Sequence, residues 1–172
     1  NAAIVCYVTM VGGQDELGFD GNSMVFDQTG ELIAHGRSFE EDLLVVDLSL
    51  DALFLARLHD PRRRSDRLVA SVREVERIAV SGAPERHARP SLPAAVAPFL
   101  DDEAEVYKAL VLGTRDYVHK NGFQTVIVGV SGGVDSSLVA TIATDARGPE
   151  NVVAVSNPSR YSSEGSIADA RR

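Results

Sequence analysis

The sequence predicts an α/β protein whose carboxyl-terminal part contains a parallel β-sheet. Residues 125–155 read as strand, glycine-rich loop, helix and strand, and this order with nearly all-apolar strands is typical of a βαβ unit. Residues 1–50 contain short β-branched runs that predict strands. The stretch between residues 50 and 98 carries five prolines and has a weaker pattern. We therefore expect two regions of regular structure joined by a connector.

The composition limits the class of protein. The chain has 172 residues, with 17 Lys+Arg against 25 Asp+Glu, which gives a formal net charge of −8. Hydrophobic residues make up 44% of the chain, which is enough for a core. One cysteine cannot form an internal disulfide, and no apolar run is long enough to cross a bilayer. These features predict a soluble, cytoplasmic protein, and the acidic balance argues against nucleic acid or a membrane as partner.

The first predicted elements are strands. Residues 3–9 form a β-branched apolar run, and residues 23–27 and 31–34 flank a turn that ends at Gly30. Glycine suits a left-handed turn position, so these two runs predict a β-hairpin. Residues 42–48 have an unbroken apolar centre, which predicts a strand buried on both faces.

The connector is predicted to be mainly irregular. Residues 51–59 and 66–80 could form short helices, but prolines recur and arginines cluster at residues 62–67. Arginines in such a polar stretch are more typical of a solvated linker than of a binding patch. The predicted division is a domain at residues 1–58, an interdomain connector at 59–98 and a second domain at 99–172.

A long amphipathic helix opens the second domain. The acidic run at residues 101–105 complements a helix dipole, and Asp102 with Glu105 has the spacing of a capping box. Asn121-Gly122 is a typical helix end. The acidic run is therefore interpreted as a helix start and not as a metal site. The residues predicted to share one face of the helix are Val106, Tyr107, Leu110, Val111, Thr114, Tyr117 and Val118.

The βαβ unit follows this helix. Its predicted strands are residues 125–130 and 152–155, its predicted helix is residues 135–146, and Gly148-Pro149 ends that helix. The carboxyl ends of parallel strands meet at one edge of a sheet, where α/β folds bind ligands. A functional site is therefore expected where the first strand turns into the helix.

The loop at that position is the candidate functional site. It reads Ser131-Gly132-Gly133-Val134-Asp135-Ser136-Ser137. Because glycines have no Cβ, an anion can approach the backbone, and the helix N-terminus points its free N–H groups the same way. The serines add hydroxyl donors. The Asp135 carboxylate would repel a phosphate unless Mg²⁺ bridged the two, so the loop predicts a site for phosphate and Mg²⁺.

The loop is neither a Walker A loop nor a G-x-G-x-x-G dinucleotide loop, because its glycine spacing differs and no lysine follows. It resembles the pyrophosphate-binding loop (PP-loop, S-G-G-x-D-S-S) of the N-type ATP pyrophosphatases. In that superfamily ATP is cleaved between its α and β phosphates, the substrate oxygen is adenylated, and pyrophosphate leaves into the loop. The loop alone leaves open NAD⁺, GMP, asparagine and argininosuccinate synthetases and tRNA-thiolating enzymes.

Two flanking segments are similar to one family, the glutamine-dependent NAD⁺ synthetases. Residues 158–164, with Ser166 and Asp169-Ala170, resemble the segment that follows the second parallel strand in that family. Residues 7–17 and 19–23 are similar to late strands of its nitrilase-like glutaminase domain. The resemblance implies the C-terminal strands of a nitrilase-like αββα sandwich, a connector, and the first βαβ unit of a Rossmann-like, adenine nucleotide alpha hydrolase-like PP-loop domain.

The resemblance also implies an enzyme with two linked reactions. A Glu-Lys-Cys triad hydrolyses glutamine, and the ammonia travels inside the protein to the synthetase domain. There ATP, with Mg²⁺, adenylates the nicotinate carboxylate of deamido-NAD⁺, and ammonia displaces AMP to give NAD⁺. Enzymes of this family usually self-associate, so a homo-oligomer is implied as well.

The implied site residues form two groups. The residues implied to hold the ATP phosphates are Gly129, Val130, Ser131, Gly132, Gly133, Val134, Asp135, Ser136 and Ser137, with Asp135 also the Mg²⁺ ligand. At the end of the second strand, Val155 and Ser156 are candidates for the adenine and ribose, and Arg160 could meet a phosphate. Asn157 and Gly165 depart from the family pattern, in which methionine and histidine are expected at these positions.

The glutaminase triad is expected before Asn1, so no catalytic residue is assigned within the chain. Cys6 lies in an apolar run without a cationic neighbour and is interpreted as a core residue. The chain is expected to be an internal fragment that is inactive alone. Two alternatives remain open, namely another PP-loop amidotransferase such as GMP synthetase, and a catalytically incomplete nucleotide-binding fragment.

Overall fold

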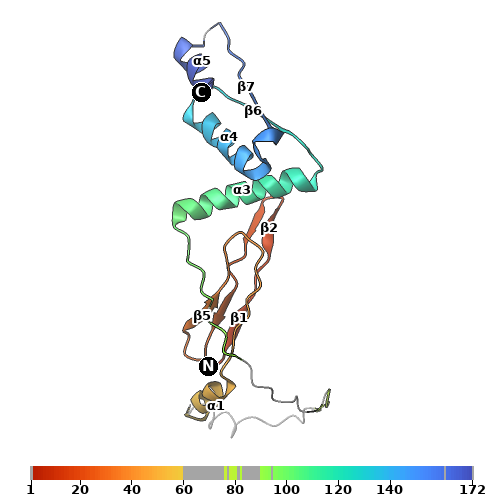
Figure 1. The fold of residues 1–172 in the computed structure, drawn as a ribbon, viewed down its shortest axis with the longest axis vertical. Coiled ribbons are helices and arrows are strands. Elements are labelled where there is room, and N and C mark those ends of the chain that lie inside the picture. Colours follow the sequence, from red (N-terminus) through yellow and green to blue (C-terminus); the bar gives the residue numbers. More distant parts are fainter. Residues whose placement is uncertain are drawn as a thin grey trace. The chain divides into compact units, whose positions relative to one another are not determined.

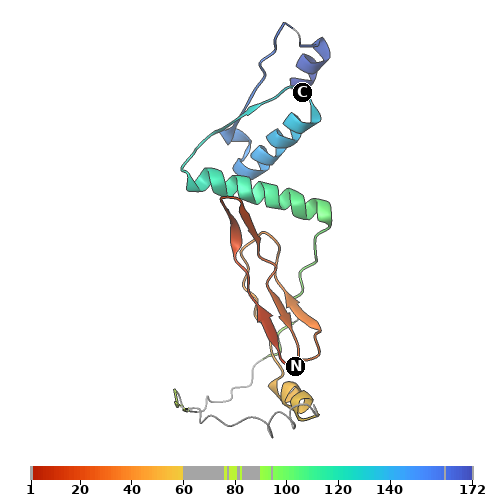
Figure 2. The same cartoon turned by 180° about the vertical axis from the view of Figure 1, so that it is seen from behind.

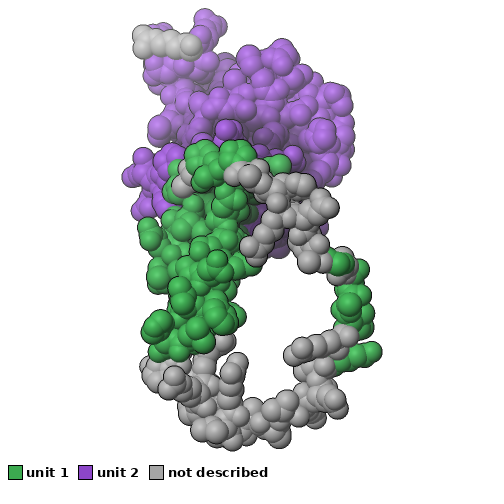
Figure 3. Space-filling view, turned by 60° about the horizontal axis from the view of Figure 1, so that its bottom comes forward, with its two compact units in different colours: residues 1–7, 23–36, 43–97 green, residues 8–22, 37–42, 98–172 purple. Residues whose placement is uncertain are grey.

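The protein has a mixed α/β structure. The computed structural model describes residues 2–59, 76, 78–80, 82, 90–93, 95–160 and 162–171. Two antiparallel sheets and one parallel sheet occur among these residues, which confirms the predicted α/β class (Figure 1). The chain divides into two compact units (Figure 3). Unit 1 comprises residues 1–7, 23–36 and 43–97, and unit 2 comprises residues 8–22, 37–42 and 98–172.

A three-stranded antiparallel sheet forms the regular part of unit 1. Its strands are β1 (Val5–Tyr7), β4 (Met24–Phe26) and β5 (Leu32–His35), with β4 in the centre. Strands β4 and β5 form the predicted hairpin, and Gly30 takes the left-handed φ of 91° that the turn requires. Strand β1 is shorter than the predicted run at residues 3–9.

Two predictions for the amino-terminal region are wrong. Residues 42–48 form no strand, and the side chains of Leu43 and Val45 are 83% and 57% exposed. An apolar run becomes a strand only where a neighbouring strand supplies hydrogen bonds, and the described sheets do not include this run. Cys6 is exposed and is not a core residue, because the edge strand β1 pairs with β4 alone and all three of its residues are exposed.

Helix α1 (Leu50–His59) confirms the helix predicted at residues 51–59. The Ser49 hydroxyl accepts a hydrogen bond from the Ala52 N–H at 3.3 Å and so caps its first turn. Most of the second helix suggested for the connector, at residues 66–80, lies outside the described residues.

The described end of the connector is fixed to β5. The backbone of His35 exchanges hydrogen bonds with Ala95 and Ala97, at 3.0 and 2.9 Å. The His35 ring is 1% exposed, and its Nδ1 lies 2.7 Å from the Ala97 carbonyl oxygen. A buried ring nitrogen is thereby satisfied by the connector backbone.

Unit 2 contains a second hairpin that was not predicted. Strands β2 (Val11–Gln14) and β3 (Leu17–Asp20) pair antiparallel, with Gly13 opposite Gly18. The chain reverses between them over two residues, and Asp15 takes a positive φ of 52° there. The turn lacks the Asn-Gly or Asp-Gly dipeptide that usually reveals a hairpin in a sequence, and so the pattern was missed.

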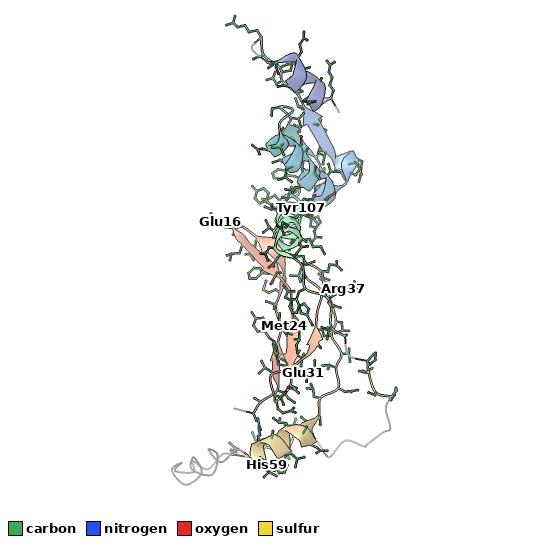
Figure 4. All side chains as sticks on the ribbon, turned by 90° about the vertical axis from the view of Figure 1, so that its left-hand side faces the viewer. Glu16, Met24, Glu31, Arg37, His59 and Tyr107 are labelled. Atoms are coloured by element: carbon green, nitrogen blue, oxygen red, sulfur yellow. The ribbon has the colours of Figure 1, made fainter. Side chains whose placement is uncertain are left out.

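Helix α3 (Asp102–Lys120) packs against this hairpin, and Figure 4 shows the turn residue Glu16 beside it. The N-cap is Asp101, whose carboxylate accepts a hydrogen bond from the Ala104 N–H at 2.8 Å. The predicted helix is confirmed, but the capping position assigned to Asp102 is wrong by one residue.

Only part of the predicted apolar face of α3 is buried. Val118 is buried, whereas Val106 and Tyr117 are each 60% exposed. Leu112 lies outside the predicted face and is 2% exposed. The helix packs against both β2 and α4, so its buried surface is not a single stripe.

The parallel βαβ unit is confirmed. Its strands are β6 (Val126–Gly129) and β7 (Val152–Val155), and they pair in parallel. Helix α4 (Val134–Arg147) lies beside both strands in Figures 1 and 2. The remaining elements are the 3-10 helix η1 (Pro149–Asn151) and helix α5 (Glu164–Ala170). Both strands point their carboxyl ends toward the loop that opens α4, and this geometry positions the site.

Candidate nucleotide-binding site

The loop between β6 and α4 is shaped by Gly132. This residue has a φ of 84°, a region that residues with a Cβ rarely occupy. A Cβ at this position would also collide with the Ser166 carbonyl oxygen in α5. The loop backbone thus needs glycine here for two independent reasons, its left-handed conformation and its close contact with α5.

The N-terminus of α4 is open toward this loop. Its N-cap is Gly133, which has no side chain to bond the N–H groups of the first turn. Helix N-termini carry a partial positive charge and free N–H donors, so this one is suited to an anion such as a phosphate. Asp135 lies in this first turn and is exposed.

The serine hydroxyls of the loop are directed inward. Ser136 and Ser137 each donate a hydrogen bond to the Gly133 carbonyl oxygen, at 2.9 and 3.0 Å. The Ser131 N–H donates to the Ser136 hydroxyl at 3.2 Å. The serines therefore brace the loop as it stands, and their hydroxyls would have to rotate to donate to a bound phosphate.

A pocket of about 610 Å³ lies where β6 and β7 end. It brings together five of the residues implied by the sequence, Gly129, Val130, Ser131, Val155 and Ser156. A volume of this size suits a small-molecule ligand. The residues of its wall that the sequence reasoning did not assign are Asn157, Pro158, Ser162, Ser163, Ser166 and Ile167. Most of them belong to the segment at residues 157–166, whose serines were the available signal.

The other implied residues lie around this pocket. Gly132 and Ser137 line a second pocket of about 380 Å³ between α4 and α5, which Val130 also borders. Gly133, Val134, Asp135 and Ser136 line neither of these two pockets. Arg160 is exposed and lies in a turn beyond β7, outside both pocket walls.

The residues present fit a Mg²⁺ ion that is shared with a substrate. Among the described residues no group of three or more His, Cys, Asp or Glu side chains could hold a metal by itself. Mg²⁺ is usually bound through one or two carboxylates together with substrate phosphates. The exposed carboxylate of Asp135 lies in the first turn of α4, so it could share such an ion with a phosphate held at this helix N-terminus.

The chain is an α/β protein with a parallel βαβ unit and a glycine-rich loop at the start of α4, an arrangement that is common in nucleotide-binding folds. Residues 106–172 match the family model described as NAD synthase. The chain is 48% identical over 169 residues to the glutamine-dependent NAD(+) synthetase of Thermotoga maritima, and 44% identical over 171 residues to that of Aquifex aeolicus.

A solved structure agrees with these relatives. The chain resembles the glutamine-dependent NAD⁺ synthetase from Acinetobacter baumannii, solved in complex with ADP, with a TM-score of 0.68 and 35% identity over 99% of the chain. The chain is therefore a homologue of the glutamine-dependent NAD⁺ synthetases over nearly its whole length, which confirms the resemblance inferred from its motifs.

The chain spans only part of these relatives. It covers 28% of the length of the Thermotoga protein, 29% of the Aquifex protein and 26% of the solved Acinetobacter chain. None of the helices in the described part of the chain is both long enough and apolar enough to cross a membrane.

Proposed function

We propose that the whole protein to which this chain belongs is a glutamine-hydrolysing NAD⁺ synthase. It amidates deamido-NAD⁺ with ammonia from glutamine, and ATP is converted to AMP and pyrophosphate. The observation that carries this proposal is the S-G-G-V-D-S-S loop at the N-terminus of α4, at the rim of the pocket where β6 and β7 end. The ADP bound in the Acinetobacter relative supports a nucleotide in this protein as well.

The proposed chemistry has two steps. A carboxylate oxygen of deamido-NAD⁺ bonds to the α-phosphorus of ATP, the bond from that phosphorus to the bridging oxygen breaks, and pyrophosphate leaves. Ammonia then bonds to the carboxyl carbon, the bond to the AMP oxygen breaks, and a proton is lost. Adenylation is needed because a carboxylate would otherwise have to expel oxide.

The residues of this chain are proposed to hold the ATP. The loop from Gly129 to Ser137 binds the phosphates, with the N–H groups at the start of α4 directed at the leaving pyrophosphate. Val155 and Ser156 line the same pocket on the β7 side, where we place the adenine and ribose. Asp135 would hold Mg²⁺, which when bound neutralises charge on the pyrophosphate.

The domain organisation is part of the proposal. Residues 1–58 belong to a nitrilase-like glutaminase domain, residues 59–98 connect the domains, and residues 99–172 begin the PP-loop synthetase domain. A homo-oligomer and a cytoplasmic location remain predictions. The supporting observations are the antiparallel strands before the connector and the parallel unit after it.

Product analysis tests the proposed reaction. The whole protein is given deamido-NAD⁺, Mg-ATP and either glutamine or ammonium, and NAD⁺ and AMP are measured. We expect both products with either nitrogen source. ADP in place of AMP would refute cleavage between the α and β phosphates. ATP binding without any NAD⁺ would instead favour a catalytically incomplete protein. In a parallel assay with XMP in place of deamido-NAD⁺, amidation of XMP alone would favour a GMP synthetase.

The role of Asp135 gives a specific prediction. We expect Asp135→Asn to lower NAD⁺ synthesis from ammonium by about 100-fold or more, since it removes the only charge that could bind Mg²⁺ at the loop. Glutamate release from glutamine should stay measurable. The matched control is Asp102→Asn, the same change in the first turn of α3, which should leave synthesis unchanged. Synthesis that survived in Asp135→Asn would show that this carboxylate does not hold the ion.

A further inference from the structure

The β2–β3 hairpin lies in a different compact unit from the strands on either side of it in the sequence. Strands β1 and β4 belong to unit 1, whereas residues 8–22 belong to unit 2 with α3 and the βαβ unit. The hairpin is thus an arm of the amino-terminal region that packs against the helix preceding the phosphate loop.

Gly13 of the hairpin is hydrogen-bonded through both its N–H and its C=O to side chains of α3. The Gly13 N–H donates a hydrogen bond to the Asp116 carboxylate at 2.8 Å. The Lys120 ammonium donates to the Gly13 carbonyl oxygen at 2.5 Å. Asp116 and Lys120 are four residues apart, so they project from the same face of the helix. Both backbone groups of Gly13 are therefore bonded to charged side chains, which form stronger hydrogen bonds than neutral partners.

The two backbones approach closely at this point. A Cβ added to Gly13 would lie 2.9 Å from the Cα of Gly113 in α3, a distance that real Cβ atoms essentially never show. Because the obstructing atom belongs to backbone, a side chain at Gly13 would push the strand away from the helix. Glycine at this position is what allows the two hydrogen bonds to form.

The charge on Asp116 is favoured by its partners. Burial acts to raise the pKa of this carboxyl, but the hydrogen bonds from the Gly13 N–H and from Arg115 outweigh burial and hold the pKa below its usual value. The Arg115 Nε lies 3.2 Å from the second carboxylate oxygen. Asp116 is thus an ionised acceptor fixed on both of its oxygens.

A short path leads from this contact to the phosphate loop. Helix α3 packs against α4, and the Tyr107 hydroxyl in α3 donates a hydrogen bond to the Asp145 carboxylate in α4 at 2.6 Å. Helix α4 in turn begins at the phosphate loop. The hairpin, the two helices and the loop are therefore consecutive elements that pack on one another.

We propose that the hydrogen bonds of Gly13 with Asp116 and Lys120 form a contact that couples glutamine hydrolysis to NAD⁺ synthesis. We call it the coupling contact. The hairpin belongs by sequence to the proposed glutaminase domain, and α3 and α4 belong to the proposed synthetase domain, so the inference rests on the proposed function. Asp116 and Lys120 act here as positioning residues. Their role would be to fix the β2–β3 hairpin on α3.

The experiment compares Gly13→Ala with Gly18→Ala in the whole protein. Gly18 faces Gly13 across the same hairpin, and a Cβ there would meet nothing within 4 Å. Three quantities are measured, namely NAD⁺ formed from ammonium, glutamate formed from glutamine, and glutamate formed per NAD⁺ when glutamine is the only nitrogen source. We expect Gly13→Ala to keep ammonium-driven synthesis and to raise glutamate per NAD⁺ about fivefold or more.

The test includes one control variant and a second pair of variants on α3. Gly18→Ala should leave all three quantities unchanged. If Gly13→Ala does not fold, Lys120→Met is compared with Lys108→Met on the same helix, and Lys120→Arg should restore the ratio because it keeps a donor near Gly13. If a folded Gly13→Ala or Lys120→Met protein forms the same amount of glutamate per NAD⁺ as the unaltered protein, the proposed role of the coupling contact is refuted. An equal loss of every activity would refute it as well.

The outcome also separates this inference from the proposed function. If the unaltered protein forms no NAD⁺ from ammonium, the proposed function fails and the ratio has no meaning. If it forms NAD⁺ from ammonium and from glutamine, and the variants keep the same glutamate per NAD⁺, the proposed function stands. Only the role of the coupling contact is then rejected.

Discussion

Gly132 shows how one residue sets the form of the phosphate loop. Its φ of 84° lies in the left-handed region, and its missing Cβ leaves room for the Ser166 carbonyl group. The serines around it then bond to the loop backbone and hold that form. The form of the loop is accordingly held by contacts within the chain itself.

This reasoning predicts the effect of Gly132→Ala. A non-glycine residue held at such a φ costs about 1–3 kcal/mol, and the collision with α5 adds to that cost. We therefore expect the affinity for ATP to fall about tenfold or more, measured by calorimetric titration of the whole protein. Gly165→Ala is the matched control, because its Cβ would meet only the Ser163 hydroxyl, at 3.9 Å. Equal affinities of the two variants would contradict this account.

At the scale of elements, the contact between α3 and α4 includes one polar link. The hydrogen bond to Asp145 is the main cause that raises the pKa of the Tyr107 hydroxyl above its usual value, and burial and the Asp145 charge act in the same direction. A raised pKa in the folded state means that the link contributes stability below pH 10, where the unfolded tyrosine is also protonated. That contribution is lost as the pH rises through the folded-state pKa.

We therefore predict that Tyr107→Phe lowers the thermal unfolding midpoint at pH 7 and that the difference from the unaltered protein disappears at strongly alkaline pH. Tyr117→Phe is the control, because Tyr117 lies on the same helix and is 60% exposed. The measurement is a series of melting curves between pH 7 and pH 11. A Tyr107→Phe difference that did not shrink with rising pH would show that the loss comes from packing and not from the hydrogen bond.

Elements with local signals were predictable from the sequence. Helix α3, the βαβ unit and the β4–β5 hairpin carry caps, periodicity or turn glycines that act within a few residues. The β2–β3 hairpin was missed because its turn, at Asp15, has no such residue. The strand expected at residues 42–48 was wrong because pairing depends on a neighbouring strand, which an apolar run cannot reveal.

The candidate site also has one part with a local sequence signal and one part without such a signal. The position of its glycine-rich loop at a helix start was predictable, since glycines, serines and an aspartate there are a local pattern, and phosphate binding by this loop stays a prediction. The opposite wall of the pocket, from Asn157 to Ile167, depends on how the chain folds back after β7. The contact of Gly13 with Asp116 joins residues 103 positions apart and has no local signal at all.

At the scale of the whole molecule, the compact units do not correspond to continuous stretches of sequence. Unit 2 takes residues 8–22 from the amino-terminal region, and these residues pack on α3. A division of the protein at residue 98 would consequently leave α3 without the hairpin that bonds to Asp116 and Lys120. The part of the chain after residue 98 should therefore depend on the β2–β3 hairpin for the stability of α3.

Hydrogen exchange tests this dependence. In a variant of the whole protein in which residues 11–20 are replaced by a short Gly-Ser turn, we expect the amides of α3 to exchange at least about tenfold faster, since local opening becomes easier where contacts are lost. The amides of β6 provide the internal control, because the main packing partners of β6 are β7 and α4 and not the hairpin. Unchanged exchange in α3 would show that the helix is stable without the hairpin.

The spacing between Gly13 and Asp116 also sets the order of events during synthesis of the chain. Ribosomes add about 5–20 residues per second, so roughly 5–20 s separate the emergence of Gly13 from that of its partner 103 residues later. During this interval the exposed peptide groups of β2 must remain without Asp116 and Lys120. The contact between the hairpin and α3 can therefore form only after Asp116 and Lys120 have been synthesised.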